Sequence, residues 1–234
     1  MSMPELIELR ARLESEFASI LAPDLAANDA DQVRIVLASE TDLQMCGEFT
    51  GLTSSRMHRW LREFVPNWSG PGPTMLIADS VIRADCHDDP AEMDARLVGV
   101  TVHELGHICC VPGLYQPDGG LPLSVDTDVR QAFRAAVASP AAFHEQPVRA
   151  DHGHEWLRAC CHLVYRMRVR GWCGLHMPQV ISHEYYSYKP MGEYTRALGD
   201  EPARLVNMPL TAALALPTPR QFLKLWARDV LSHV

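Results

Sequence analysis

Two histidines and a glutamate within residues 101–107 have the spacing of a catalytic zinc site. The segment reads Thr-Val-His-Glu-Leu-Gly-His, so His103 and His107 are four residues apart and Glu104 follows the first of them. Residues four apart share one face of a helix, and both imidazoles can therefore bind one metal ion. Glu104 can take a proton from a water at that metal without being a ligand itself. The pattern predicts a zinc ion on His103 and His107, with Glu104 as general base.

The residues around this motif predict the helix that it needs. Asp89 and Pro90 fit an N-cap and a first helical position, and Glu92 stands three residues after the cap, as in a capping box. A stripe of apolar side chains at helical spacing, expected to be buried roughly opposite the histidines, consists of Val98, Val102, Leu105 and Cys109. The alternative interpretation is that His103 and His107 are surface histidines of an amphipathic helix without a metal.

Composition limits the class of protein. A chain of 234 residues with 47% hydrophobic residues can bury the core of one large domain, or of one domain with an appendage. No stretch approaches the roughly 20 apolar residues of a membrane span, and the first residues lack the layout of a secretory signal, so we expect a cytoplasmic protein without a membrane partner. Seven cysteines without a Cys-x-x-Cys pair are expected to be reduced thiols. The net charge of −8 disfavours nucleic acid as a partner.

Hydrophobic periodicity predicts an α+β order of elements before the motif. In chain order we expect a helix over residues 4–21, a strand over 33–37, a turn-rich passage around Gly47 and Gly51, a short helix over 57–64, and a strand over 74–79. Helix, strands and then the metal helix is the order of a zincin-type domain. If residues 76–79 form an edge strand, they can take an extended peptide by strand addition. The alternative is an ordinary core strand.

A second helix after the motif can bring the third metal ligand. Apolar residues from Trp156 onwards have helical spacing, and this helix is expected to stop at Gly171. His152 and His154 lie at the N-terminal end of this predicted helix. The metzincin continuation of the motif fails, because Cys110 and Gly113 stand where its glycine and third histidine should be. Further on, the tyrosines at 185, 186 and 188 are weak candidates for oxyanion donors, and residues 221–230 predict a closing amphipathic helix.

The His-Glu-x-x-His motif followed by His152-Gly153 and then Trp156 at a helix entrance resembles the SprT-like family, which includes the Spartan proteases of DNA–protein crosslink repair. The resemblance covers about residues 74–171 and implies zinc ligands His103, His107 and His152 with Glu104 as base. The chain departs from the family in three ways. The gap between His107 and His152 is 152 − 107 = 45 residues, the family's cysteine ribbon is missing, and the charge balance is acidic.

These patterns together predict a zinc metallopeptidase that hydrolyses a protein or peptide substrate. Zinc would supply an acidified water, and Glu104 would move its proton to the leaving amine. We expect residues 1–180 to form a zincin-like α+β domain with a small mixed sheet and a possible cover inserted at 111–150. Residues 181–234 would form an extension packed on the core. The oligomeric state does not follow from sequence.

Three alternatives stay open at this point. His154 competes with His152 for the third ligand position. A gluzincin-like hydrolase would instead use a glutamate, for which the candidates are Glu145, Glu155 and Glu184. A non-catalytic module stabilised by zinc would not need Glu104.

The resemblance to the SprT-like family and the acidic composition of the chain lead to opposite expectations about nucleic acid as a partner. Affinity for DNA depends largely on Lys and Arg that neutralise phosphates. The main concentration of basic residues consists of Arg149, Arg158, Arg166, Arg168 and Arg170. Three of them crowd the end of the second helix, where the helix dipole and solvation account for them. We therefore expect no more than weak, salt-sensitive DNA association by the isolated chain.

Overall fold

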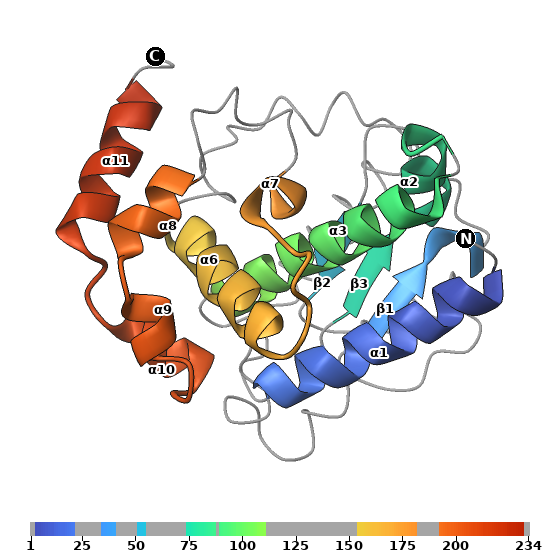
Figure 1. Ribbon diagram of the computed structural model, residues 1–234, viewed down its shortest axis with the longest axis horizontal. Coiled ribbons are helices and arrows are strands. Elements are labelled where there is room, and N and C mark those ends of the chain that lie inside the picture. The colour runs from blue at the N-terminus through green and yellow to red at the C-terminus, as the bar shows by residue number, and fades with distance from the viewer. Residues whose placement is uncertain are drawn as a thin grey trace, which may run out of the picture.

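A computed structural model describes residues 3–21, 34–40, 51–54, 74–87, 89–110, 154–181 and 192–231. In chain order the elements are α1 (Met3–Leu21), β1 (Arg34–Leu37), the 3-10 helix η2 (Ala38–Glu40), β2 (Gly51–Ser54), β3 (Thr74–Ile77), α2 (Asp79–Asp85), α3 (Pro90–Cys110), α6 (His154–Val169), α7 (Met177–Val180), α8 (Gly192–Leu198), α9 (Glu201–Arg204), α10 (Leu210–Ala215) and α11 (Arg220–Leu231) (Figure 1). The described residues are mostly helical, with one small sheet. None of the helices in these ranges is long and apolar enough to cross a membrane.

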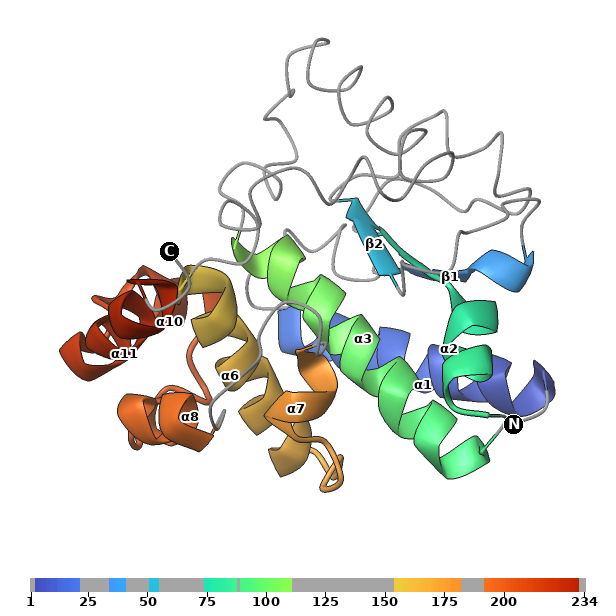
Figure 2. The ribbon, with the colours of Figure 1, turned by 90° about the horizontal axis from the view of Figure 1, so that it is seen from above.

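The sheet has three strands in the order β1-β3-β2. β1 is parallel to β3, with Ile35 opposite Met75, and β2 is antiparallel to β3, with Leu52 opposite Leu76. α1 and α3 lie on the same side of this sheet (Figure 2). The mixed sheet and the helices are consistent with the predicted α+β class. The narrower prediction of a zincin-like domain depends on the metal ligands.

Three details of the expected strands differ from the structure. β3 is the central strand, so both of its sides are already paired and residues 76–79 cannot add a peptide strand. Strand order depends on contacts far apart in the chain, which periodicity does not contain. Gly51 begins β2 instead of marking a turn, and Asp79 begins α2 instead of ending a strand. The expected short helix over 57–64 lies outside the described residues.

Two carboxylates, half-buried Glu14 and buried Asp79, bind the backbone in and beside strand β1. Glu14 of α1 accepts a hydrogen bond from the backbone N–H of Ile35 at 2.7 Å, on the side of β1 that does not face β3. Burial raises the pKa of Glu14 above its ordinary value. Asp79 is buried and accepts bonds from the backbone N–H and the hydroxyl of Ser39 in η2 at 3.0 and 2.6 Å. The bond to Ile35 satisfies a donor on the outer side of β1 that an added strand would otherwise take.

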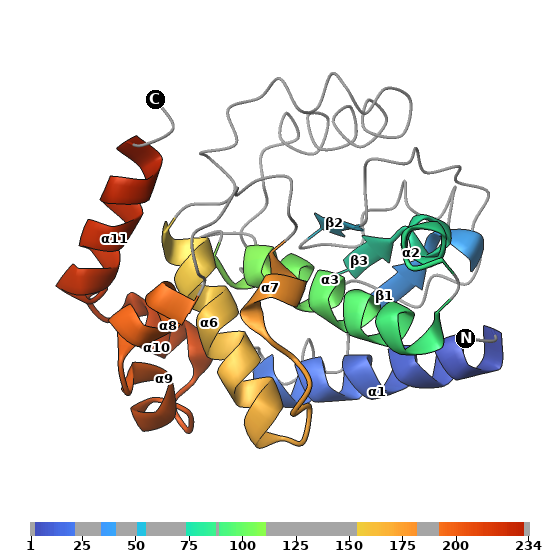
Figure 3. The same ribbon diagram turned by 45° about the horizontal axis from the view of Figure 1, so that its top comes forward.

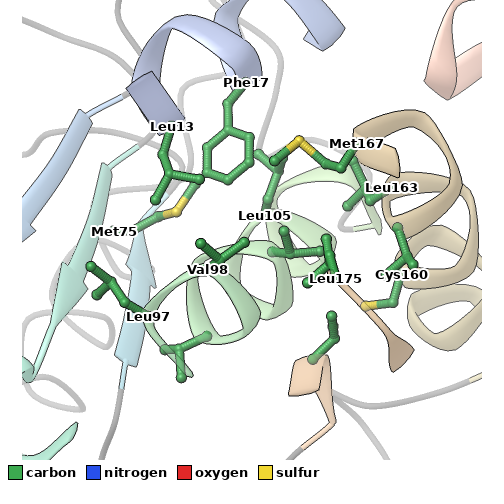
Figure 4. Close-up of a cluster of buried hydrophobic side chains, with 14 of the residues drawn as sticks. Leu13, Phe17, Met75, Leu97, Val98, Leu105, Cys160, Leu163, Met167 and Leu175 are labelled. Carbon is green, nitrogen blue, oxygen red and sulfur yellow. The ribbon is translucent and has the colours of Figure 1, made fainter. Parts of the chain in front are cut away.

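The core lies where α1, the sheet, α3 and α6 meet. The close-up shows side chains of these elements pointing toward one another, among them Phe17, Met75, Leu105 and Met167 (Figure 4). Among the cysteines whose side chains the structure describes, none is in a disulfide, and Cys160 and Cys161 are buried in α6. Burial raises the pKa of the Cys161 thiol to about 12, so this thiol stays protonated at neutral pH.

α6 lies between α3 and the C-terminal helices α8 to α11 (Figure 3). Every side chain from Trp156 to Val164 is buried, including Arg158 and His162. Arg158 Nε donates to Glu201 at 2.8 Å, and its Nη atoms donate to the carbonyls of Ala213, Leu214 and Leu216 at 3.1, 3.1 and 2.8 Å. Arg158 therefore binds both Glu201 of α9 and the carbonyl end of α10.

The arginine concentration seen in the sequence is not one surface patch. Arg166 is buried and donates to the carbonyls of Leu205 and Met208 at 3.0 and 2.6 Å. Arg158 is buried as described above, whereas Arg168 and Arg170 are exposed and Arg149 lies outside the described residues. Two of the five arginines are thus used inside the protein, which leaves fewer of them for phosphate contacts.

The buried pair between Arg158 and Glu201 makes the first prediction. Glu201→Ala removes the carboxylate and leaves a buried guanidinium without its ionic partner, so we expect the free energy of unfolding to fall by about 3–5 kcal/mol. The matched control is Glu193→Ala, because Glu193 pairs with Arg228 at 3.1 Å where the side chains are 36% and 53% exposed. An exposed pair contributes about 1 kcal/mol or less. Urea denaturation of both variants measures the difference, and equal losses would contradict the assignment.

The second prediction concerns pH. Burial lowers the pKa of His162 below its ordinary value, although the neighbouring Glu201 opposes the shift. The unfolded chain therefore takes up a proton that folded His162 resists, and the free energy of unfolding should decrease as the pH falls below about 6.5. We expect His162→Gln to flatten this part of the pH dependence. The control His87→Asn changes an exposed histidine and should keep the wild-type slope in urea titrations across this range.

Candidate metal centre

The helix that carries the motif begins as its sequence predicts. Asp89 Oδ1 accepts hydrogen bonds from the backbone N–H groups of Ala91 and Glu92 at 2.9 and 3.4 Å, so Asp89 is the N-cap of α3. α3 then continues through the whole motif to Cys110. His103 and His107 are therefore one helical turn apart on one face. In the stripe expected to be buried, Val98, Val102 and Leu105 are buried and Cys109 is half-buried.

His103 is half-buried between α6 and α7. Its Nδ1 lies 2.9 Å from the carbonyl oxygen of Val180, the last residue of α7. A carbonyl oxygen only accepts hydrogen bonds, so Nδ1 carries the proton and Nε2 of the neutral ring carries the lone pair. The ring centroid lies 4.7 Å from that of Trp156 in an edge-on contact, and Trp156 Nε1 donates to the backbone carbonyl of His103 at 3.3 Å. Both the ring plane and the tautomer of His103 are thereby set.

Two glycines of α3 let other elements approach on either side of His103. A Cβ added at Gly99 would lie 2.0 Å from the backbone oxygen of Gln179 in α7. A Cβ added at Gly106 would lie 2.7 Å from Cys160 Sγ and 2.9 Å from Trp156 Nε1 in α6. These separations are far below van der Waals contact, so α6 and α7 can sit where they do only because both positions lack a side chain.

Glu104, the expected base, is buried, with 6% of its surface exposed. Glutamates are almost never fully buried unless they are paired. The neighbouring Thr101 is buried as well, and its hydroxyl bonds to the carbonyls of Leu97 and Val98 inside α3. Glu104 follows His103 directly on the same helix, which is the order that the motif requires.

The structure describes only part of the expected ligand set. It places His103 and His107 in α3, but the side chain of His107 and the whole of His152 lie outside what is described. Within the described residues, no group of three His, Cys, Asp or Glu side chains is arranged to hold a metal. Glu145, Glu184, the tyrosines at 185, 186 and 188, and the inserted segment 111–150 also lie outside the described residues.

The competing ligand His154 is the first residue of α6 and faces a different neighbour. Its ring centroid lies 6.4 Å from that of Trp226 in α11, again in an edge-on contact. Trp156, two residues later and roughly 200° further round the helix, contacts His103 instead. Glu155, between them, is exposed. Among the described residues, Trp156 and Cys160 are the α6 side chains that lie against the motif, whereas His154 is directed toward α11.

Sequence reasoning missed α7 and the role of the glycines. α7 has only four residues, which is too short for a periodic signal. A glycine inside a helix lowers helix stability by about 1 kcal/mol relative to alanine, and such a glycine often has a packing reason. Gly99 and Gly106 were the available signals, because both stand inside the predicted helix.

The surroundings of His103, the one member of the expected ligand set whose side chain the structure describes, are compatible with a metal ligand. A zinc-bound histidine usually donates its other ring N–H to a carboxylate or a backbone carbonyl, which fixes the tautomer that presents the lone pair to the metal. The bond from His103 Nδ1 to Val180 has this form.

The chain matches no protein-family model, no curated protein and no solved structure. The interpretation of the site therefore depends on its own geometry and on the motif.

Proposed function

We propose that this chain is a zinc-dependent metallopeptidase of SprT-like type, with His103, His107 and His152 as ligands and Glu104 as general base. The observation that carries the proposal is the bond from His103 Nδ1 to the Val180 carbonyl, on the helix that bears the motif. An unrelated surface histidine has no need of a fixed tautomer. Buried Glu104 adds to this support.

The arrangement of α6 favours His152 as the third ligand. His152 precedes Trp156 by four residues, a chain length of at most about 14 Å, and Trp156 touches the ring of His103. His154 is turned toward Trp226 and α11. Exposed Glu155 gains no such support, so the gluzincin-like alternative is the weaker one.

In the proposed reaction each residue has one task. A bound zinc ion would supply a water of lowered pKa and would polarise the scissile carbonyl. Glu104 accepts the proton of the attacking water and delivers it to the leaving amine. The Nδ1–H group of His103 donates to the Val180 carbonyl throughout, so the orientation of the imidazole ring does not change during the reaction. Glu104 is buried, so its side chain has little freedom to reorient.

The proposed substrate is a protein or peptide. An extended substrate cannot pair with β3, and the bond from Ile35 to Glu14 closes the outer side of β1 at that residue. Burial of Arg158 and Arg166 supports an activity that does not depend on DNA. A DNA-stimulated peptidase would contradict this part of the proposal.

The third prediction separates base from ligand. Glu104→Gln removes the proton acceptor but no metal ligand, so we expect about one zinc per chain to remain and peptide hydrolysis to fall by at least about 10²–10⁴-fold. Elemental analysis and cleavage of an unstructured protein substrate measure the two effects. A variant that loses its zinc would show that Glu104 is a ligand. A wild-type protein that holds zinc but cleaves no substrate would favour the non-catalytic module.

The fourth prediction concerns the third ligand. His152→Ala should lose tight zinc binding, because only two protein ligands remain, whereas His154→Ala should retain it. Glu155→Ala is a further control on the same turn of α6. Zinc affinities measured by competition with a chelator compare the three variants. If His154→Ala or Glu155→Ala alone loses the metal, that residue replaces His152 in the site.

A further inference from the structure

We propose that α7 is the positioning element of the metal centre: its Val180 carbonyl sets the tautomer of His103, and Gly99 is the residue that admits α7 to this position. The proposal rests on the proposed function for the role of His103 as a ligand. The hydrogen bond between His103 and Val180 and the close approach of Gln179 to Gly99 are features of the structure and do not depend on that function.

The Val180 carbonyl is suited to this task by its place at a helix end. The last carbonyls of a helix have no partner within the helix. Val180 is the last residue of α7, and its oxygen accepts from His103 across 77 positions of sequence. Met177 and Val180 are both buried, so apolar packing holds α7 in place.

A second bond closes the start of α7. The backbone N–H of His176 donates to the side-chain oxygen of Gln179 at 2.6 Å. The N–H of Ile181 bonds back to the carbonyl of Met177 at 3.1 Å. A single helical turn would fray in isolation, but here both of its ends are tied. The position of the Val180 oxygen is therefore well defined.

Gly99 couples α7 directly to the motif helix. Its position is one turn before His103, and a Cβ there would lie 2.0 Å from the oxygen and 2.6 Å from the carbonyl carbon of Gln179. These are backbone atoms, so an added methyl group cannot be accommodated by a side-chain rotation. Gln179 is bonded to Val180, and any shift of the one moves the hydrogen-bond acceptor of His103.

The direct test is Gly99→Ala. We expect the His103 ring in zinc-free protein to lose its preference for the Nδ1–H tautomer, as read from imidazole ¹⁵N shifts. Zinc affinity measured by chelator competition should fall about 10–100-fold, the usual effect of losing an outer hydrogen-bond partner of a ligand. The matched control is Gly174→Ala, in the turn just before α7, where an added Cβ meets nothing within 4 Å. It should leave both readouts unchanged.

A milder pair of variants covers the case in which Gly99→Ala does not fold. Gln179→Ala keeps the Cβ but removes the acceptor of the His176 N–H, so α7 should loosen and the same two readouts should change in the same direction. Gln179→Glu keeps an oxygen acceptor and should restore them. A residue with only a structural role would change stability without changing the tautomer.

The outcomes separate this inference from the proposed function. If the His103 tautomer is unchanged in both Gly99→Ala and Gln179→Ala, α7 does not position the ring and the inference is overturned. If the wild-type protein binds no zinc but its tautomer responds to these variants as expected, the positioning role stands and the metallopeptidase proposal fails. If the tautomer responds and zinc affinity falls with it, both are supported.

Discussion

The arrangement depends on one steric constraint, the close approach of α6 and α7 to the face of α3 that carries Gly99, His103 and Gly106. These residues lie at spacings of four and three, so they line one face of the helix. The absence of side chains at the two glycines brings a carbonyl of α7 and the indole of Trp156 to the histidine between them. A helix with alanines at these positions would be more stable alone but would hold its neighbours further away. The two glycines thus lower the stability of the isolated helix, but they allow the neighbouring helices to fix the position of the His103 side chain.

α6 has the harder packing problem, because it is buried on several sides. Its Trp156 and Cys160 meet α3, while Arg158 and His162 meet the C-terminal helices. A helix buried all round is normally apolar all round. Here the polar side chains are tolerated because Glu201 and the carbonyl end of α10 satisfy them. The N-terminal half of α6 is therefore held from the α3 side by packing and from the opposite side by hydrogen bonds.

Local sequence patterns predicted the elements that have local causes. The start of α3 follows from Asp89 and Pro90, and the periodicity from Trp156 onwards predicted α6, which ends before Gly171 at a positive φ of 103°. Strand order was not predictable in this way, because β3 becomes central only through pairings with residues about 20 and 40 positions earlier in the chain.

The site shows the same division. His103 and Glu104 follow from spacing, but the acceptor of the His103 N–H is a main-chain carbonyl 77 residues away. A carbonyl is present at every residue and has no letter in the sequence, so no motif could have pointed to Val180. The burial of Arg158 and Arg166 could not be predicted from the sequence for the same reason, because their partners are largely main-chain oxygens.

Arg158 binds α10 through its side chain, whereas α10 contributes backbone atoms. Substitutions therefore affect the two partners of this contact differently. The acceptors at Ala213, Leu214 and Leu216 are backbone atoms, so exchanges of these side chains leave the hydrogen bonds themselves in place. Arg158 has no such freedom, because few other side chains could reach several carbonyls and Glu201 at once. Substitutions at the three acceptor positions can therefore leave the path of this segment over α6 unchanged, whereas a substitution of Arg158 removes all of these bonds at once.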